Sequence, residues 1–217
     1  VELFEESLAL KRTLGDRQGV AQILNNLGTF AVNRGDSNAA HKLHEESLQI
    51  RREIGDKSGI SQSLCNLGDI AYRQGDYEPA RKLFYESIKI TQEIGNRWGT
   101  AFCLLNLGYI AIEQREFSNA LTICKESLVS FIEVNDQAGI IYTLVGIASA
   151  DAGLGKYYES TKILAVAENL RENIQLKLQS DGLGLYEKSL EDIHTSITES
   201  QFSEAWSSGI EMSLDDI

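Results

Sequence analysis

The sequence contains a single proline, Pro79, and no long apolar run. Proline interrupts helices, so its scarcity in a chain of 217 residues is compatible with a protein that is helical throughout. No apolar stretch approaches the roughly 18 residues that cross a bilayer, so we expect no membrane span. A charged-then-apolar leader is also missing. The chain opens on Val1, and we expect it to be a fragment or domain of a longer protein.

Positive charge is scarce as well. Lysine and arginine number 20 against 32 acidic residues, a net charge of −12, and residues 181–217 hold nine acids but one lysine. Such a chain lacks the positive field that dominates affinity for nucleic acid, so we expect no direct binding to DNA or RNA. Cys65, Cys103 and Cys124 are odd in number and show no CxxC spacing. They indicate small buried or groove positions in a reducing compartment, and the expected location is cytoplasmic.

The most prominent feature of the sequence is internal repetition. Asn66-Leu67-Gly68 also stands 40 residues earlier, at residues 26–28, and 40 residues later, at residues 106–108. Similarity at a fixed period of this size indicates stacked supersecondary units, each of which buries its core against its neighbours. We expect a repeat array over residues 1–180 and an acidic helical cap over 181–217. The array divides into a half repeat at 1–20, repeats at 21–60, 61–100 and 101–140, and a degenerate repeat at 141–180.

Each period holds two helical patterns. In residues 60–71, apolar or small side chains recur at steps of three and four, which indicates one face of a helix. Gly75 ends this helix, and Asp76 is the expected N-cap of a second helix with Pro79 in its first turn. The expected caps of the following helix pairs are Asp16, Asp56, Asn96 and Asp136.

The first helices contain a recurrent glycine. A glycine within a helix costs about 1 kcal/mol relative to alanine, so its recurrence needs a packing reason. We expect small residues on both helices to let them approach closely. The expected pairs are Gly28 with Ala40, Gly68 with Ala80, and Gly108 with Ala120.

No set of residues is suited to catalysis, and we expect a protein that is not an enzyme. No Ser, Cys or Lys has the neighbours that a nucleophile needs. Residues 153–156, Gly-Leu-Gly-Lys, lack the spacing of a phosphate-binding loop and fall at a turn of the fourth repeat. His41 and His44 lie one helical turn apart, but a metal site needs three or four ligands. Because His44 aligns with Phe84 of the next repeat, we expect packing there, and neither a metal nor a cofactor.

One set of residues in the second repeat has a familiar spacing: Leu64, Leu67-Gly68, Gly75-Asp76-Tyr77, Ala80 and Phe84. These residues resemble the tetratricopeptide pattern, in a variant with about six extra residues per unit. The resemblance covers residues 1–180 and implies an all-α fold. That fold is a right-handed α-solenoid of antiparallel helix pairs with a concave groove lined by the first helices, here followed by a helical C-terminal cap.

The tail resembles the helical ending that follows such repeats in large bacterial signalling ATPases and related regulators. The nucleotide-binding module of those proteins is missing from this chain, as is the proline pair that often precedes their tail. The residues concerned are Tyr186, Phe202, Ala205-Trp206, Gly209, Ser213-Leu214 and Ile217.

The resemblance also implies which residues bind a ligand. In a tetratricopeptide unit the second, fifth, ninth and twelfth residues of the first helix face the groove. Applied to this chain, the groove changes from polar to apolar and aromatic along the array. The predicted groove residues are Gln62, Asp69, Tyr72, Arg73, Phe102, Leu105, Tyr109, Ile112 and Tyr142.

The helix predicted at residues 101–112 is apolar on both its groove face and its core face, so we expect something to cover it. Two coverings remain open: the chain's own tail, through Tyr186, Phe202 and Trp206, or a partner peptide or helix. The predicted function is a scaffold-like interaction module that binds a protein segment within a larger bacterial signalling protein. The alternative is a sensor arm that binds a small metabolite or sugar and controls an upstream ATPase module.

Overall fold

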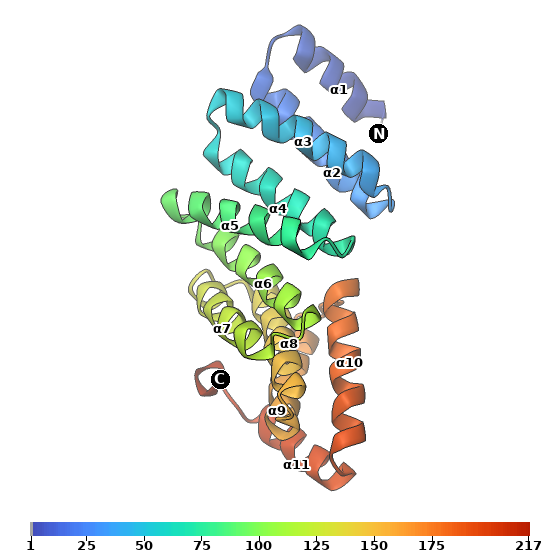
Figure 1. The fold of residues 1–217 in the computed structure, drawn as a ribbon, viewed down its shortest axis with the longest axis vertical. Helices are drawn as coiled ribbons and strands as arrows, with labels where there is room; N and C mark the ends of the chain where they lie inside the picture. Colours follow the sequence, from blue (N-terminus) through green and yellow to red (C-terminus); the bar gives the residue numbers. More distant parts are fainter. Residues whose placement is uncertain (1) are drawn as a thin grey trace. The chain divides into compact units, whose positions relative to one another are not determined.

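The computed structural model describes residues 2–217, without the side chains of residues 2, 180, 181 and 215. Throughout this described part the chain is helical and contains no strand, and consecutive helices pack as pairs (Figure 1). The predicted all-α solenoid of tetratricopeptide type is confirmed. The chain divides into two compact units, which we call unit 1 (residues 1–103) and unit 2 (residues 104–217). The division predicted at residue 180 remains a prediction.

Unit 1 is built from two complete helix pairs. Within it, α2 packs on α3 and α4 packs on α5, while α3 also packs on α4. Leu48 of α3 meets Leu64 and Leu67 of α4 in the core between successive pairs. The helices are α1 (Glu2–Thr13), α2 (Arg17–Asn33), α3 (Ser37–Ile54), α4 (Lys57–Arg73) and α5 (Tyr77–Glu93), and α6 (Arg97–Glu113) begins in unit 1 and ends in unit 2.

Unit 2 continues the pattern and then departs from it. Its helices are α7 (Phe117–Glu133), α8 (Gln137–Gly153), α9 (Tyr157–Asn173), α10 (Ser180–Ser196) and α11 (Glu199–Ile210), followed by a 3-10 turn at Leu214–Asp216. The α8 helix packs between α7 and α9. Of the two tail helices, α10 lies against α8 and α9, and α11 packs on α9 (Figure 1). The crossing of α11 over α9 is close, because a Cβ added to Gly209 would lie 2.3 Å from the carbonyl oxygen of Lys162.

A residue with positive φ follows each of the first nine helices, always 20 residues after the previous one. Glycine adopts this conformation freely, whereas a residue with a Cβ pays roughly 1–2 kcal/mol for it. Three members of the series are not glycine, and their φ values are 60°, 55° and 53° for Arg115, Asn135 and Gln175. The turn predicted around Gly155, whose φ is 77°, is confirmed. The glycines of the series are Gly15, Gly35, Gly55, Gly75, Gly95 and Gly155.

The predicted helix caps are mostly confirmed. A side-chain oxygen accepts from the backbone N–H of the glycine three residues on, at 2.8–2.9 Å, in all four caps of the first helices. Such caps typically contribute about 1 kcal/mol each. Asp76 also stands at an N-cap, but its side chain accepts no capping hydrogen bond from the described backbone. The four confirmed caps are Asp16, Asp56, Asn96 and Asp136.

The recurrent glycines face a residue one turn later than predicted. A Cβ added to Gly68 would lie 2.9 Å from two ring carbons of Phe84, and Ala80 is not among its nearest neighbours. Phe84 itself is fully buried. Glycine therefore makes room for a large side chain of the second helix. The equivalent contacts are Gly28 with His44 and Gly108 with Cys124; at Gly108 the predicted partner Ala120 is also near, because its carbonyl oxygen would lie 3.8 Å from an added Cβ.

None of the described helices is both long enough and apolar enough to cross a membrane.

Candidate functional site

In unit 1, two of the predicted groove residues line a hollow of about 330 Å³ between α4 and the start of α6. We call it the α4–α6 hollow. Gln62 and Phe102 belong to its wall, whereas Asp69, Tyr72 and Arg73 lie further along α4. The complete lining is Ser58, Ser61, Gln62, Cys65, Asn66, Thr91, Asn96, Trp98, Gly99 and Phe102.

One side of the hollow is aromatic. Trp98 and Phe102, one turn apart on α6, stack with ring centroids 5.4 Å apart and planes 12° from parallel. Trp98 is 49% exposed although it is the largest apolar side chain in the wall. Large aromatic side chains dominate many recognition surfaces because they bury much area with few rotatable bonds. This wall is therefore a platform on which a flat or apolar group can lie.

The opposite side is polar and is held by a buried arginine. The Nη2 atom of Arg51 donates to Oε1 of Gln62 at 3.1 Å, and its Nη1 atom donates to the carbonyl of Gly59 at 2.7 Å and to Ser63 Oγ at 3.0 Å. Burial lowers the pKa of the Arg51 guanidinium, and the nearby Asp56 carboxylate opposes that shift. The bond from Nη2 fixes the side-chain carbonyl of Gln62, a residue of the hollow's wall.

Sequence reasoning missed Arg51. The equivalent positions in the next two repeats carry Thr91 and Phe131. The equivalent position in the preceding half repeat is Lys11, so a basic residue occurs there in two of the four copies. One local feature could have indicated its role: Arg51 stands eight residues before Gly59 and donates to the carbonyl of Gly59 in the first turn of α4.

The recurrent asparagine ties helices together in unit 1. Nδ2 of Asn66 donates to Oδ1 of Asn25 at 2.9 Å and lies 3.4 Å from Nδ1 of His44, so α4 is joined to α2 and α3. At Asn66 the recurrent asparagine therefore bridges neighbouring helices. His44 is 1% exposed, and burial lowers its pKa to about 4, with Arg51 and His41 contributing. The packing role predicted for His44 is confirmed.

Beyond the hollow, α4 carries a charged and aromatic strip. Nε of Arg73 donates to Oδ2 of Asp69 at 2.9 Å, and both side chains stay partly exposed. The Tyr72 ring is half-buried and lies 6.2 Å from the Tyr77 ring, at an angle of 40°. Asp69, Tyr72 and Arg73 are therefore partly exposed at the surface of unit 1.

In unit 2 the predicted groove residues are covered. Leu105, Tyr109 and Ile112 are 7%, 4% and 6% exposed. The hydroxyl of Tyr109 donates to the backbone carbonyl of Tyr142 at 2.9 Å. The hydroxyl of Tyr142 in turn accepts from the backbone N–H of Gln179 at 2.8 Å. A hydrogen-bonded chain thus runs from α6 through α8 to the start of α10.

The α10 helix meets this surface through small and aliphatic residues. A Cβ added to Gly182 would lie 2.5 Å from the ring of Tyr142. Further along, Oγ of Ser189 lies 2.7 Å from Oγ of Ser149, and Leu185 is buried. Leu185 and Ser189 also face Ile112 across a hollow of about 460 Å³.

The tail aromatics named by the sequence have other neighbours. Phe202 stacks on His194 and on Trp206, with centroids 4.4 and 5.4 Å apart, so these rings pack within the tail. Tyr186 is half-buried, and burial raises its pKa to about 12. Leu185 and Ser189, which fasten the tail, were not predicted for this role because they are small or aliphatic and carry no motif; Gly209 belonged to the tail pattern, but its contact with α9 was not predicted.

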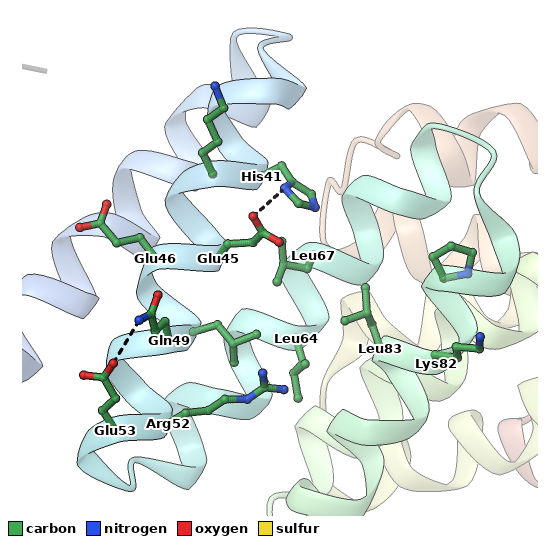
Figure 2. Close-up of a pocket in the computed structure, with 13 residues that line it drawn as sticks. His41, Glu45, Glu46, Gln49, Arg52, Glu53, Leu64, Leu67, Lys82 and Leu83 are labelled. Atoms are coloured by element: carbon green, nitrogen blue, oxygen red, sulfur yellow. Dashed lines mark hydrogen bonds and ion pairs between the residues drawn. The ribbon is translucent and has the colours of Figure 1, made fainter.

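A hollow of about 970 Å³ lies over the second helices α3 and α5 of unit 1 (Figure 2). Its floor is leucine and its rim is charged. Arg52 donates to Glu86 at 2.7 Å and Arg12 to Glu46 at 2.6 Å, each pair joining a second helix to the next. Exposed pairs of this kind contribute roughly 0–1 kcal/mol. No predicted groove residue lines this hollow, and we interpret it as the seam between repeats.

In the described part of the chain, no group of three or more His, Cys, Asp or Glu side chains is arranged so that it could hold a metal ion.

The helix pairs, the glycine contacts and the recurrent caps define a helical repeat protein. A family model of the tetratricopeptide repeat matches residues 19–93 and, in an overlapping second match, residues 58–133. These matches span more than half of the chain, which therefore belongs to the tetratricopeptide repeat family. Repeats of this family generally mediate protein–protein interaction and form a non-catalytic interaction fold.

No curated protein matches the sequence. Among solved structures, the chain is similar to BtubC (BKLC) from P. vanneervenii, with a TM-score of 0.68. The similarity covers 96% of this chain and 86% of that one at 15% identity. At this level of identity the likeness shows the fold alone.

Proposed function

We propose that unit 1 binds a segment of a partner protein along α4 and the start of α6. The observation that carries the proposal is the exposed Trp98 stacked on Phe102 beside the polar wall of the α4–α6 hollow. An aromatic platform next to fixed amide groups suits a peptide, because apolar side chains rest on the rings while the peptide backbone hydrogen-bonds to the amides.

The remaining predicted residues of unit 1 extend this proposed site. Gln62 is positioned by Arg51 and supplies an amide donor. Tyr72 adds a second aromatic surface, and the ion pair of Arg73 with Asp69 offers charges of both signs. Charges at the edge of a site influence specificity and association rate more than affinity, so we assign the affinity to the aromatic residues.

We further propose that α10 occupies the unit 2 part of the predicted groove as an internal ligand. Support comes from the hydrogen bond between Tyr142 and Gln179, from the contact of Gly182 with the Tyr142 ring, and from the burial of Tyr109. On this proposal Leu105, Tyr109, Ile112 and Tyr142 hold the tail, and an external partner binds through unit 1.

The wider setting is also a proposal. The resemblance of the tail to that of bacterial signalling ATPases and regulators favours a larger signalling protein of which this chain is one part. Three free cysteines favour a reducing compartment, and the cytoplasm is the one we propose.

A second candidate function is binding of a small metabolite or sugar in the same hollow, by a sensor arm that controls an upstream ATPase module. One observation favours it: the hollow has the volume of a small ligand site, and its lining combines a stacked aromatic pair with amide and hydroxyl groups.

The test selects peptides that bind the chain from a random display library and measures their affinity by calorimetry. Trp98→Ala should weaken a selected peptide at least about tenfold, which is ~1.4 kcal/mol, without lowering helicity. The matched control is Tyr85→Ala, because Tyr85 lies on the second helix α5 and is 48% exposed, like Trp98. Equal affinity of the Trp98→Ala and Tyr85→Ala variants contradicts the proposal. A library of sugars and amino acids, screened by thermal shift with the same variants, tests the second candidate.

A further inference from the structure

Two of the three cysteines meet in unit 1. Sγ of Cys65 on α4 lies 2.8 Å from Sγ of Cys103 on α6, and both are free thiols. A disulfide bond measures about 2.05 Å, so the two sulfurs need to move less than about 1 Å to form one. The two residues are 38 positions apart and come from the first helices of neighbouring repeats. A bond between them joins one repeat to the next.

Access to the two sulfurs is unequal. Cys65 forms part of the wall of the α4–α6 hollow and is 8% exposed, whereas Cys103 is fully buried. A small reagent that enters the hollow therefore meets Cys65 first and reaches Cys103 only through it.

The hydrogen bonds around Cys65 also favour it as the reactive thiol. Sγ of Cys65 lies 2.8 Å from Sγ of Cys103 and 3.1 Å from the hydroxyl of Ser87, which also donates to the carbonyl of Ser61 at 3.0 Å. The hydrogen bonds with Cys103 and with Ser87 lower the pKa of Cys65, although burial opposes this shift. The hydrogen bond with Cys65 and burial raise the pKa of Cys103. Thiolate formation is thus easier at the sulfur that is accessible.

We propose that Cys65 and Cys103 are a peroxide-sensitive dithiol, in which Cys65 is the attacked residue and Cys103 is the resolving residue. The oxidant is a small hydroperoxide, ROOH. In the first step the Cys65 thiolate attacks one peroxide oxygen, an S–O bond forms and the O–O bond breaks. The leaving RO⁻ takes up a proton to give ROH, and Cys65 becomes a sulfenic acid.

In the second step Sγ of Cys103 attacks Sγ of Cys65. The S–S bond forms, the S–O bond breaks, and hydroxide leaves with the Cys103 proton as water. The sum is two thiols and ROOH giving one disulfide, ROH and water. The product fixes the second turn of α6, where Cys103 lies, to α4 beside the wall that contains Trp98 and Phe102. This inference does not depend on the proposed binding function.

The test treats the purified, reduced chain with a few equivalents of hydrogen peroxide at neutral pH and counts thiols after denaturation. The count should fall from three to one, with a mass loss of two hydrogens and a tryptic peptide pair linked between Cys65 and Cys103. Dithiothreitol should restore all three thiols. Cys103→Ser should stop at the sulfenic acid, which dimedone traps at Cys65, and Cys65→Ser should keep its two thiols under the same dose.

The matched control is Cys124→Ser, because Cys124 is fully buried in unit 2. It should still lose two thiols, and circular dichroism should show that each variant is folded. Retention of three thiols at a dose that oxidises free glutathione overturns the proposal. So does a disulfide that involves Cys124, a disulfide between two chains, or a dimedone adduct at Cys103 in preference to Cys65.

Discussion

Replacing Gly68 with leucine tests the packing of the repeat most directly. The first carbon of any side chain at this position lies 2.9 Å from the ring of Phe84, which is fully buried and has no solvent to move into. Overpacking of this kind costs ~1–3 kcal/mol, and a leucine adds further carbons beyond the one that already clashes. Leaving glycine returns about 1 kcal/mol of helix propensity. We therefore expect a net loss of about 2 kcal/mol, which for a chain of this size lowers the melting temperature by roughly 4–8 °C.

Urea denaturation followed by circular dichroism measures this loss, and a helical glycine without neighbours provides the control. A Cβ added to Gly184 in α10 would meet nothing within 4 Å, so Gly184→Ala should gain up to about 1 kcal/mol. A double variant isolates the contact itself. Phe84→Ala alone should cost ~3–5 kcal/mol, and combined with Gly68→Leu the loss should fall short of the sum by ~1–3 kcal/mol. Strict additivity, or a Gly68→Leu variant as stable as the parent, contradicts the assigned contact.

Three other outcomes are expected. The pKa of His44 is lowered from 6.5 to about 4 in the folded chain, so the neutral side chain stabilises the fold fully above pH 6.5 and this contribution is lost as the pH falls toward 4. The loss is worth ~1.4 kcal/mol per pKa unit. Unfolding titrations should show it in the parent and in His41→Gln but not in His44→Phe. Arg115 has a φ of 60°, which glycine adopts without strain, so Arg115→Gly should raise the free energy of unfolding by roughly 1 kcal/mol and shift the urea midpoint upward. An unchanged midpoint shows that the turn is not strained. Gly182→Leu should push α10 off Tyr142, and hydrogen exchange should accelerate along α10; protection equal to the parent's contradicts the contact.

Periodicity made the helix pairs and their ends predictable. A chain that repeats every 40 residues shows its caps several times, so Asp56 and Asn96 could be recognised by their shared position even though the residue type changes. The facing residue of Gly68 was missed by one turn. Sequence spacing gives the face of each helix but not the angle at which two helices cross, and that angle decides whether Ala80 or Phe84 lies opposite.

Several residues of the candidate site could not be predicted from the 40-residue period. Arg51 is buried where its equivalents in the following repeats are threonine and phenylalanine and in the preceding half repeat is Lys11, so alignment of the repeats does not fix the character of this position. Cys65 and Cys103 are 38 residues apart, two short of the period, and their contact crosses from one first helix to the next on a diagonal. The place of α10 also depends on side-chain packing, because the segment from residue 174 to residue 179 carries no pattern that fixes its direction.

The recurrent ion pairs of unit 1 have a consequence for how the number of repeats can change. Arg12–Glu46 and Arg52–Glu86 are the same pair one period apart, and so are Arg17–Glu53 and Lys57–Glu93. The segment 21–60 therefore carries both acidic partners, Glu46 and Glu53, and both basic partners, Arg52 and Lys57, whereas in the next repeat the position of Arg52 is Gln92. A duplicated copy of residues 21–60 inserted after residue 60 finds matching charges on both sides without any compensating substitution. The protein can thus gain a whole 40-residue repeat without losing these ion pairs, while the residues that line the α4–α6 hollow are free to diverge between copies.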